Sequence, residues 1–194
     1  TMEIQFTFIN EDYTLDIDDD DIYEISYDDG EIETSINAGE GNYLCVKFTP
    51  DSYPVDLYRA SFYCGGSSTG VGFVNVWDDD GEDGKPGTPL VQGFPLNMIQ
   101  GWNEINFVNE GFSIPIADGG IYVGYQQLAV NFNLGIDWNN ASYASNSMLD
   151  FGIGLGWEPL GNYSTGGVWM IRAQMDGENA LEAIDDLNSN IPDR

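Results

Sequence analysis

The sequence predicts an all-β protein, built as a single antiparallel β-sandwich of about eight to eleven strands. Short stretches of alternating apolar and polar residues recur along the chain, and Gly, Asn, Asp or Pro bounds each of them. Before Gly177, no stretch shows a sustained apolar period of about 3.6 residues, which argues against alternating helices and strands. The 24 glycines suit the many tight connections of such a sandwich.

Each expected strand is a β-rich stretch that ends at a turn signal. In chain order, strands are expected over residues 22–30, 42–49, 57–64, 73–77, a partner ending at 90, 102–108, 112–116, 121–127, 132–136, 147–151 and 168–175. The alternation of apolar and polar residues then predicts which side chains of each strand face the core. The expected inward residues are Leu44, Val46, Phe48, Tyr58, Ala60, Phe62, Ile105, Phe107, Trp169, Ile171, Ala173 and Met175.

The chain divides into one domain and two flanking segments. With 194 residues it is long enough for one well-buried domain. Residues 1–21 form an acidic lead-in, and its Asp-rich run at 16–21 is either solvated or a second cation site. Residues 22–176 form the sandwich. Residues 177–194 are expected to be a linker or a short helix.

The charge balance of the chain limits the classes of molecule that it is expected to bind. Five Lys and Arg residues stand against 33 Asp and Glu residues, giving a net charge of −28. Nucleic acid is a poor partner, because no basic surface can displace counterions from phosphate. Membrane insertion is not expected, since no apolar run approaches roughly 20 residues. Cations are the expected small partners. The alternative is that the acidity only keeps the surface soluble.

The composition argues against an enzyme. The chain has no histidine, which removes Ser-His-Asp and Cys-His catalysis and histidine-based zinc sites. No glycine-rich phosphate loop followed by Lys and Ser or Thr is present. Paired carboxylates are abundant, so a glycoside hydrolase stays open as an alternative.

The two cysteines are expected to be free thiols. In the strand around Cys45, the outward Lys47 places Cys45 on the outer face. In the strand around Cys64, the outward Arg59 and Ser61 turn Cys64 inward. Thiols on opposite faces pair badly, so we expect both to be buried or half-buried and unbonded.

The strongest candidate metal site is the hairpin at residues 73–90. Five acidic residues gather between glycines at its tip, and oxygen ligands on a rigid turn suit Ca²⁺. They are Asp78, Asp79, Asp80, Glu82 and Asp83. No Glu lies at the twelfth position, so the loop is not an EF-hand. A solvated acidic turn is the alternative.

Two weaker acidic turns accompany the tip. The first contains Asp28, Asp29 and Glu31, and the second combines Asp137 with Asn139 and Asn140. Both offer carboxylate and amide oxygens to a hard cation.

Tryptophans offer a candidate ligand surface. Of the five in the chain, Trp102 and Trp138 are expected to be the most exposed. Rings on one face would form a sugar-stacking platform, whereas most rings in a sandwich pack in the core or at its rim.

Several motifs together resemble a known domain type. They are YDDGE at 27–31, VKFTP at 46–50, VWDDDG at 76–81, GKPGTPL at 84–90, IYVGY at 121–125, LGID at 134–137 and GGVWMIRA at 166–173. This succession resembles the jelly-roll-like β-sandwich accessory domains of secreted bacterial peptidases and multidomain cell-surface proteins. The resemblance implies an exported, non-catalytic module and supplies no binding residues.

These observations lead to a functional expectation. The chain is expected to be an accessory or binding module of a larger secreted or cell-surface bacterial protein, with loops stabilised by calcium. Its expected partners are flanking domains of the same polypeptide and a glycan or cell-wall component. The alternatives are a carbohydrate-binding module that uses Trp102 and Trp138, a glycoside hydrolase, and a structural spacer.

Overall fold

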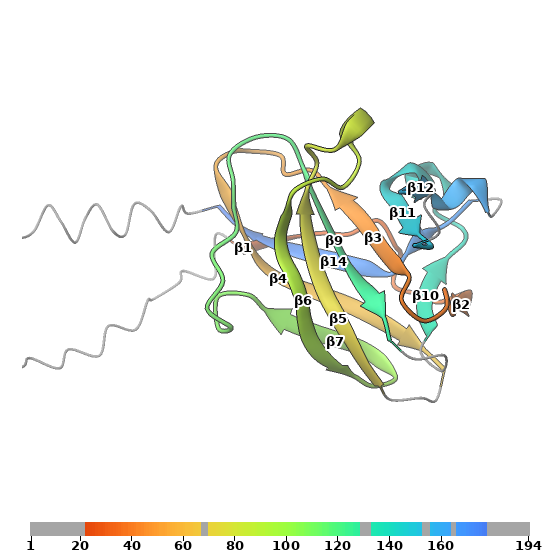
Figure 1. Ribbon diagram of the computed structural model, residues 1–194. Helices are drawn as coiled ribbons and strands as arrows, with labels where there is room; N and C mark the ends of the chain where they lie inside the picture. Colours follow the sequence, from red (N-terminus) through yellow and green to blue (C-terminus); the bar gives the residue numbers. More distant parts are fainter. Residues whose placement is uncertain (1–21, 67–69, 129–132, 153–155, 164–165, 178–194) are drawn as a thin grey trace, which may run out of the picture.

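The computed structural model describes residues 22–66, 70–128, 133–152, 156–163 and 166–177. Two antiparallel sheets pack face to face (Figure 1). The prediction of an all-β antiparallel sandwich is therefore confirmed. The lead-in at 1–21 and the helix expected after Gly177 lie outside the described residues. Within the described residues, no helix has the length and apolarity needed to cross a membrane.

The strands fall into two sheets, which we name the A sheet and the B sheet. The A sheet contains β1 (Ile22–Ile25), β2 (Thr34–Ile36), β4 (Val55–Gly65), β7 (Gly101–Asn106), β8 (Pro115–Ile116), β10 (Asn133–Asp137), β13 (Val168–Trp169) and β14 (Ile171–Asp176). The B sheet contains β3 (Tyr43–Phe48), β5 (Gly70–Asp78), β6 (Pro89–Met98), β9 (Ile121–Gln127), β11 (Ser147–Asp150) and β12 (Glu158–Pro159). In the described residues, three short 3₁₀ helices lie between strands: η2 (Glu82–Gly84), η3 (Ala141–Asn146) and η4 (Leu160–Asn162).

The hydrophobic core lies between the sheets, as strand alternation predicts. In β3 and β14, every second residue is buried in the main core, beginning with Leu44 and Ile171. Ile105 and Phe107, at the end of β7 and just beyond it, are also buried there. All the expected inward residues except Tyr58 belong to this core. Local alternation therefore fixed the faces of the long strands.

Tyr58 is the exception, because β4 contains a β-bulge. Along the pairing with β14, Gln174 lies opposite Arg59, while Met175 lies opposite Leu57. Tyr58 is the extra residue, so Leu57 takes the buried place and Tyr58 is half-buried. A bulge shifts the alternation by one residue, and the sequence pattern carries no sign of it.

The strand count also differs from the expectation. The described residues contain fourteen strands. The excess comes from β2 and β12, which are too short to show alternation, and from the division of one expected strand into β13 and β14. The strand expected over 168–175 is interrupted at Met170, whose N–H donates to the Gly135 carbonyl at 2.9 Å.

The thiol prediction is confirmed. Cys45 and Cys64 are both free and buried. Cys64 belongs to the main core, whereas Cys45 lies in a separate cluster with Trp77, Tyr122 and Met148. Burial raises the pKa of the Cys64 thiol to about 12 and that of Cys45 well above its usual value. Both therefore remain protonated at neutral pH and are poor nucleophiles.

Candidate functional site

The acidic hairpin forms at the expected place. β5 and β6 pair from Gly70 and Met98 up to Trp77 and Pro89. Beyond this ladder, the Asp78 N–H donates to the Thr88 carbonyl at 2.8 Å, and the Gly87 N–H donates to the Asp78 carbonyl at 2.9 Å. The tip, which we define as residues 78–88, is therefore an ordered turn.

Two tip carboxylates pair with donors inside the protein. Asp79 Oδ2 lies 2.8 Å from Lys47 Nζ on β3 and accepts the Gly120 N–H at 2.9 Å. Asp80 accepts the Thr88 N–H and hydroxyl, both at 2.6 Å. Both hydrogen bonds lower the pKa of Asp80, and the bond from the hydroxyl has the larger effect.

The tip is also attached to the B sheet beneath it, through the Tyr122 hydroxyl, which donates to the Gly84 carbonyl at 2.8 Å. The Lys47 ammonium group thus offsets part of the negative charge of the tip. Calcium binding by the five tip residues stays a prediction.

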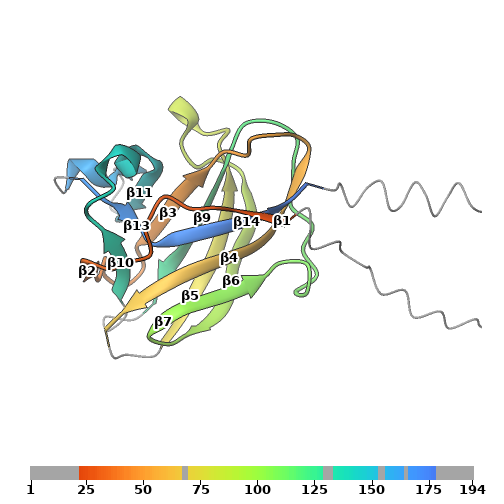
Figure 2. The ribbon, with the colours of Figure 1, turned by 180° about the vertical axis from the view of Figure 1, so that it is seen from behind.

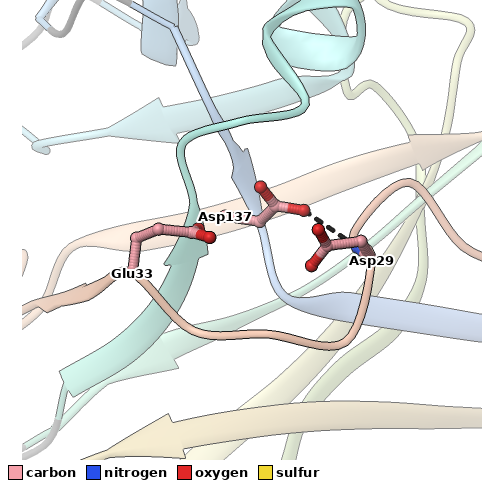
Figure 3. Close-up of side chains that lie close together, drawn as sticks. All are labelled: Asp29, Glu33 and Asp137. Atoms are coloured by element: carbon pink, nitrogen blue, oxygen red, sulfur yellow. Dashed lines mark hydrogen bonds between the residues drawn. The ribbon is translucent and has the colours of Figure 1, made fainter.

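The two weaker acidic turns meet in space. Asp29 and Glu33, from the connection between β1 and β2, lie beside Asp137 at the end of β10 (Figure 3). One carboxylate oxygen from each lies within 4.8 Å of the others. We call these three residues the acidic corner. Their arrangement could hold a metal ion, and an all-oxygen donor set suits a hard cation such as Ca²⁺.

Asp137 anchors this corner. Its side chain is fully buried, with Oδ2 accepting the Asp29 N–H at 2.9 Å and the Asn140 side-chain amide at 2.6 Å. Its Oδ1 accepts the N–H groups of Asn139 at 2.9 Å and Asn140 at 3.2 Å. A buried carboxylate needs such donors, because an unpartnered one would be costly.

Glu33 completes the corner, and the sequence analysis missed it. Its two carboxylate oxygens accept the Trp138 N–H at 2.8 Å and the Asn139 side-chain amide at 2.9 Å. The available signal was its position two residues after Glu31 in the same acidic run. Glu33 precedes β2, which pairs with β10, and this pairing brings it to Asp137.

Asp28 performs a different role beside the corner. Its side chain is fully buried and accepts Arg172 Nη2 at 2.6 Å and Nε at 3.2 Å. The hydrogen bond to Asp28 raises the pKa of Arg172. Figure 2 shows the connection from β1 to β2 running alongside β14, which carries Arg172. Asp28 is therefore a structural ion-pair partner.

The same arginine covers Trp102. The Arg172 guanidinium lies 4.4 Å from the centre of the Trp102 ring, and Tyr63 contacts that ring edge-on at 5.3 Å between centroids. Trp102 is half-buried and lies on the outer side of β7, whereas Asn103 and Ile105 are buried on the opposite side of the strand. Through Arg172 it is linked to Asp28, which precedes Asp29 in the sequence.

Trp138 adjoins the corner directly, since its backbone N–H donates to the Glu33 carboxylate. Its ring is half-buried against the core. A side chain at Gly167, where φ is +116°, would lie 2.6 Å from the ring, so this glycine leaves room for it. Of the two predicted tryptophans, Trp138 therefore contacts the acidic corner, whereas Trp102 contacts Arg172. Ligand binding by Trp102 and Trp138 stays a prediction.

A further aromatic group lies elsewhere and was not foreseen. Tyr43, Trp77 and Trp157 meet edge-on, with the Trp77 and Trp157 centroids 5.0 Å apart. They pack with Cys45, on the opposite side of β3 from the main core. Sequence alternation does not reveal this group, because Trp157 comes from a loop.

Neither a family model nor a curated protein matches the chain. Its fold is similar to the crystal structure of the cysteine protease and lectin-like domains of Cwp84, a surface layer associated protein of Clostridium difficile. The TM-score is 0.54 at 14% sequence identity, and the match covers 83% of this chain and 37% of that one. This chain therefore spans well under half the length of that protein chain. At this identity the similarity establishes the β-sandwich fold alone.

Proposed function

We propose that this protein is a non-catalytic binding module of a larger secreted or cell-surface protein and that it binds a glycan or cell-wall component. The observation that carries the proposal is the fold shared with a surface layer associated protein that contains a lectin-like domain. An all-β chain resembles a lectin-like domain more than a cysteine protease. The absence of histidine and the protonated, buried thiols agree with a non-catalytic role.

The proposed binding surface consists of Trp102 on the outer side of β7 and Trp138 at the acidic corner. The two residues supply apolar ring surface, while Asp29 and Glu33 are exposed hydrogen-bond acceptors at the corner. Sugars are bound by this combination of aromatic faces and polar groups. Arg172 holds the Trp102 ring in place, which lowers the entropy lost on binding.

The binding test is a glycan array followed by calorimetry on the 194-residue chain. Trp102→Ala and Trp138→Ala are each expected to weaken binding about tenfold, since a well-placed aromatic contact is worth about 1.5 kcal/mol. Trp157→Ala, in the loop before β12, is the matched control and should bind normally. Blank arrays, or an equal loss in the control, would contradict the proposal. Turnover of a bound polysaccharide would favour the hydrolase alternative.

We infer that Ca²⁺ stabilises the acidic corner. Three carboxylates whose oxygens approach within 4.8 Å repel one another, and the partners of Asp137 and Glu33 that the structure describes are neutral amides. A divalent cation would remove this repulsion and fix the β1–β2 connection beside the binding surface. The extreme negative charge of −28 adds to the attraction for cations.

The calcium test is a melting curve at matched ionic strength with and without millimolar Ca²⁺. A cation at ten times its dissociation constant adds about 1.4 kcal/mol, which corresponds to a few degrees in Tm. Asp29→Asn combined with Glu33→Gln should remove this gain, whereas Asp80→Asn combined with Asp83→Asn should keep it. The opposite pattern would assign the ion to the tip, and an unchanged wild-type curve would exclude a calcium site.

A further inference from the structure

A half-open pocket lies at the other end of β2 from the acidic corner. Glu33 precedes β2, whereas Asn37 and Ala38, which line the pocket, follow it. The pocket has a volume of about 160 Å³. The proposed binding surface at Trp102 and Trp138 does not include it, so the pocket is a separate site.

The inner wall of the pocket is apolar. Its lining includes Leu44 from β3, Leu149 from β11, Leu160 from η4 and Trp169 from β13. The Trp169 indole N–H is already bonded to the Met148 carbonyl at 3.2 Å. It therefore offers no donor to a ligand, and the inner wall recognises apolar surface only.

The mouth combines two aromatic rings with an amide rim. Phe151 and Tyr163 meet edge-on with centroids 5.2 Å apart, and Tyr163 is 50% exposed. The rim is fixed in position, because the Ala38 N–H donates to the buried Gln127 side chain at 2.9 Å. The Asn37 side chain accepts the Gly39 N–H at 2.8 Å. The pocket is thus preformed.

The size and the lining of the pocket determine which kind of ligand fits. A dry cavity of about 150 Å³ lined by Leu, Ile and Phe binds benzene, so this pocket suits one group of that size. A sugar ring would bury hydroxyl groups without partners, which is costly. The lining contains no charged residue, and the net charge of −28 repels anions. The group that fits is neutral and apolar.

We propose that this pocket binds one apolar side chain, of Phe or Leu, presented by a polypeptide ligand. A residue within a polypeptide carries its ring or branched chain without a free carboxylate. Its backbone amides stay at the open mouth, where Tyr163 is 50% exposed and water can satisfy them. The apolar group thus meets the inner wall, while the neutral backbone stays in solvent.

The test uses capped amino acids as probes of the full chain. The ¹³C-methyl NMR signals of Leu44, Leu149 and Leu160 are followed during titration with the N-acetyl amides of phenylalanine, leucine and alanine. The phenylalanine and leucine amides should bind at least about tenfold more tightly than the alanine amide, because only they fill the pocket. Equal shifts with all three would overturn the proposal.

Two variant pairs locate the binding. Ala38→Leu should block the pocket and abolish the shifts, whereas Ala117→Leu, at an exposed alanine before β9, should leave them unchanged. If Ala38→Leu melts early, Tyr163→Ala replaces it, with the exposed Tyr143→Ala as control. Loss of binding in a control alone would overturn the assignment. So would binding of benzene or N-acetylglucosamine at these methyls without binding of the capped residues.

Discussion

The tip and the acidic corner show two ways in which one chain accommodates neighbouring carboxylates. At the tip, Asp79 pairs with Lys47 from β3, and Asp80 accepts hydrogen bonds from Thr88 within the tip itself. At the corner, the described partners of Asp137 are backbone N–H groups and one side-chain amide. Acid density along the sequence is higher at the tip, yet oxygens converge at the corner.

The comparison teaches that carboxylate oxygens do not necessarily converge where acidic residues are densest in the sequence. Consecutive aspartates on a turn point in different directions, and each finds its own donor. Converging oxygens require segments that are held together by strand pairing, as β2 and β10 hold Glu33 near Asp137. The following predictions test this difference, from the largest expected effect to the smallest.

Asp137→Ala should cause the largest loss of stability. The substitution removes the acceptor of four hydrogen bonds and leaves donors near a buried site unpaired, at a cost of about 3 kcal/mol. Urea denaturation measures the change. Glu82→Ala, at an exposed tip position, is the control and should stay within about 0.5 kcal/mol of wild type. Equal effects of the two would remove the distinction between tip and corner.

Arg172→Lys should cost about 2 kcal/mol. Lysine cannot reproduce the guanidinium's donor geometry towards the fully buried Asp28 carboxylate, nor its stacking on Trp102. A double-mutant cycle with Asp28→Asn should show coupling between the two residues. Additive effects would mean that the pair does not hold the β1–β2 connection in place.

Lys47→Met should cost about 1 kcal/mol, because the ion pair with Asp79 is partly exposed. The loss should shrink as salt is added, since salt already screens the wild-type attraction. Chemical denaturation at low and high salt measures both effects. A variant as stable as wild type at low salt would show that Lys47 does not attach the tip to the B sheet.

Thr88→Val should change the acid sensitivity of the tip. In the native protein the Thr88 hydroxyl lowers the pKa of Asp80. The stabilisation from this hydrogen bond is therefore complete above the ordinary aspartate pKa of about 4, and it is lost as the pH falls through the lowered pKa. The variant should lose part of this dependence, and the Asp80 pKa should rise towards its ordinary value. NMR titration of the carboxyl carbon measures it, and an unchanged pKa would contradict the assignment.

The sequence was informative where the signal is local. Alternation identified the long strands and their faces, and it placed Cys45 and Cys64 on opposite sides of their sheets. It failed at Tyr58, where a bulge shifts the register against β14, and at β2 and β12, which are short strands that form only through their partners. In each case the missing information lies in another strand.

The sequence by itself determined the β-sandwich, the free thiols and the lack of histidine-based catalysis, because composition and period-two alternation are properties of the chain alone. Only the tertiary structure decided which acids meet. Asp29 and Asp137 are 108 positions apart, and their contact depends on antiparallel pairing of β2 with β10. Long-range pairing sets such distances, and no local pattern encodes them.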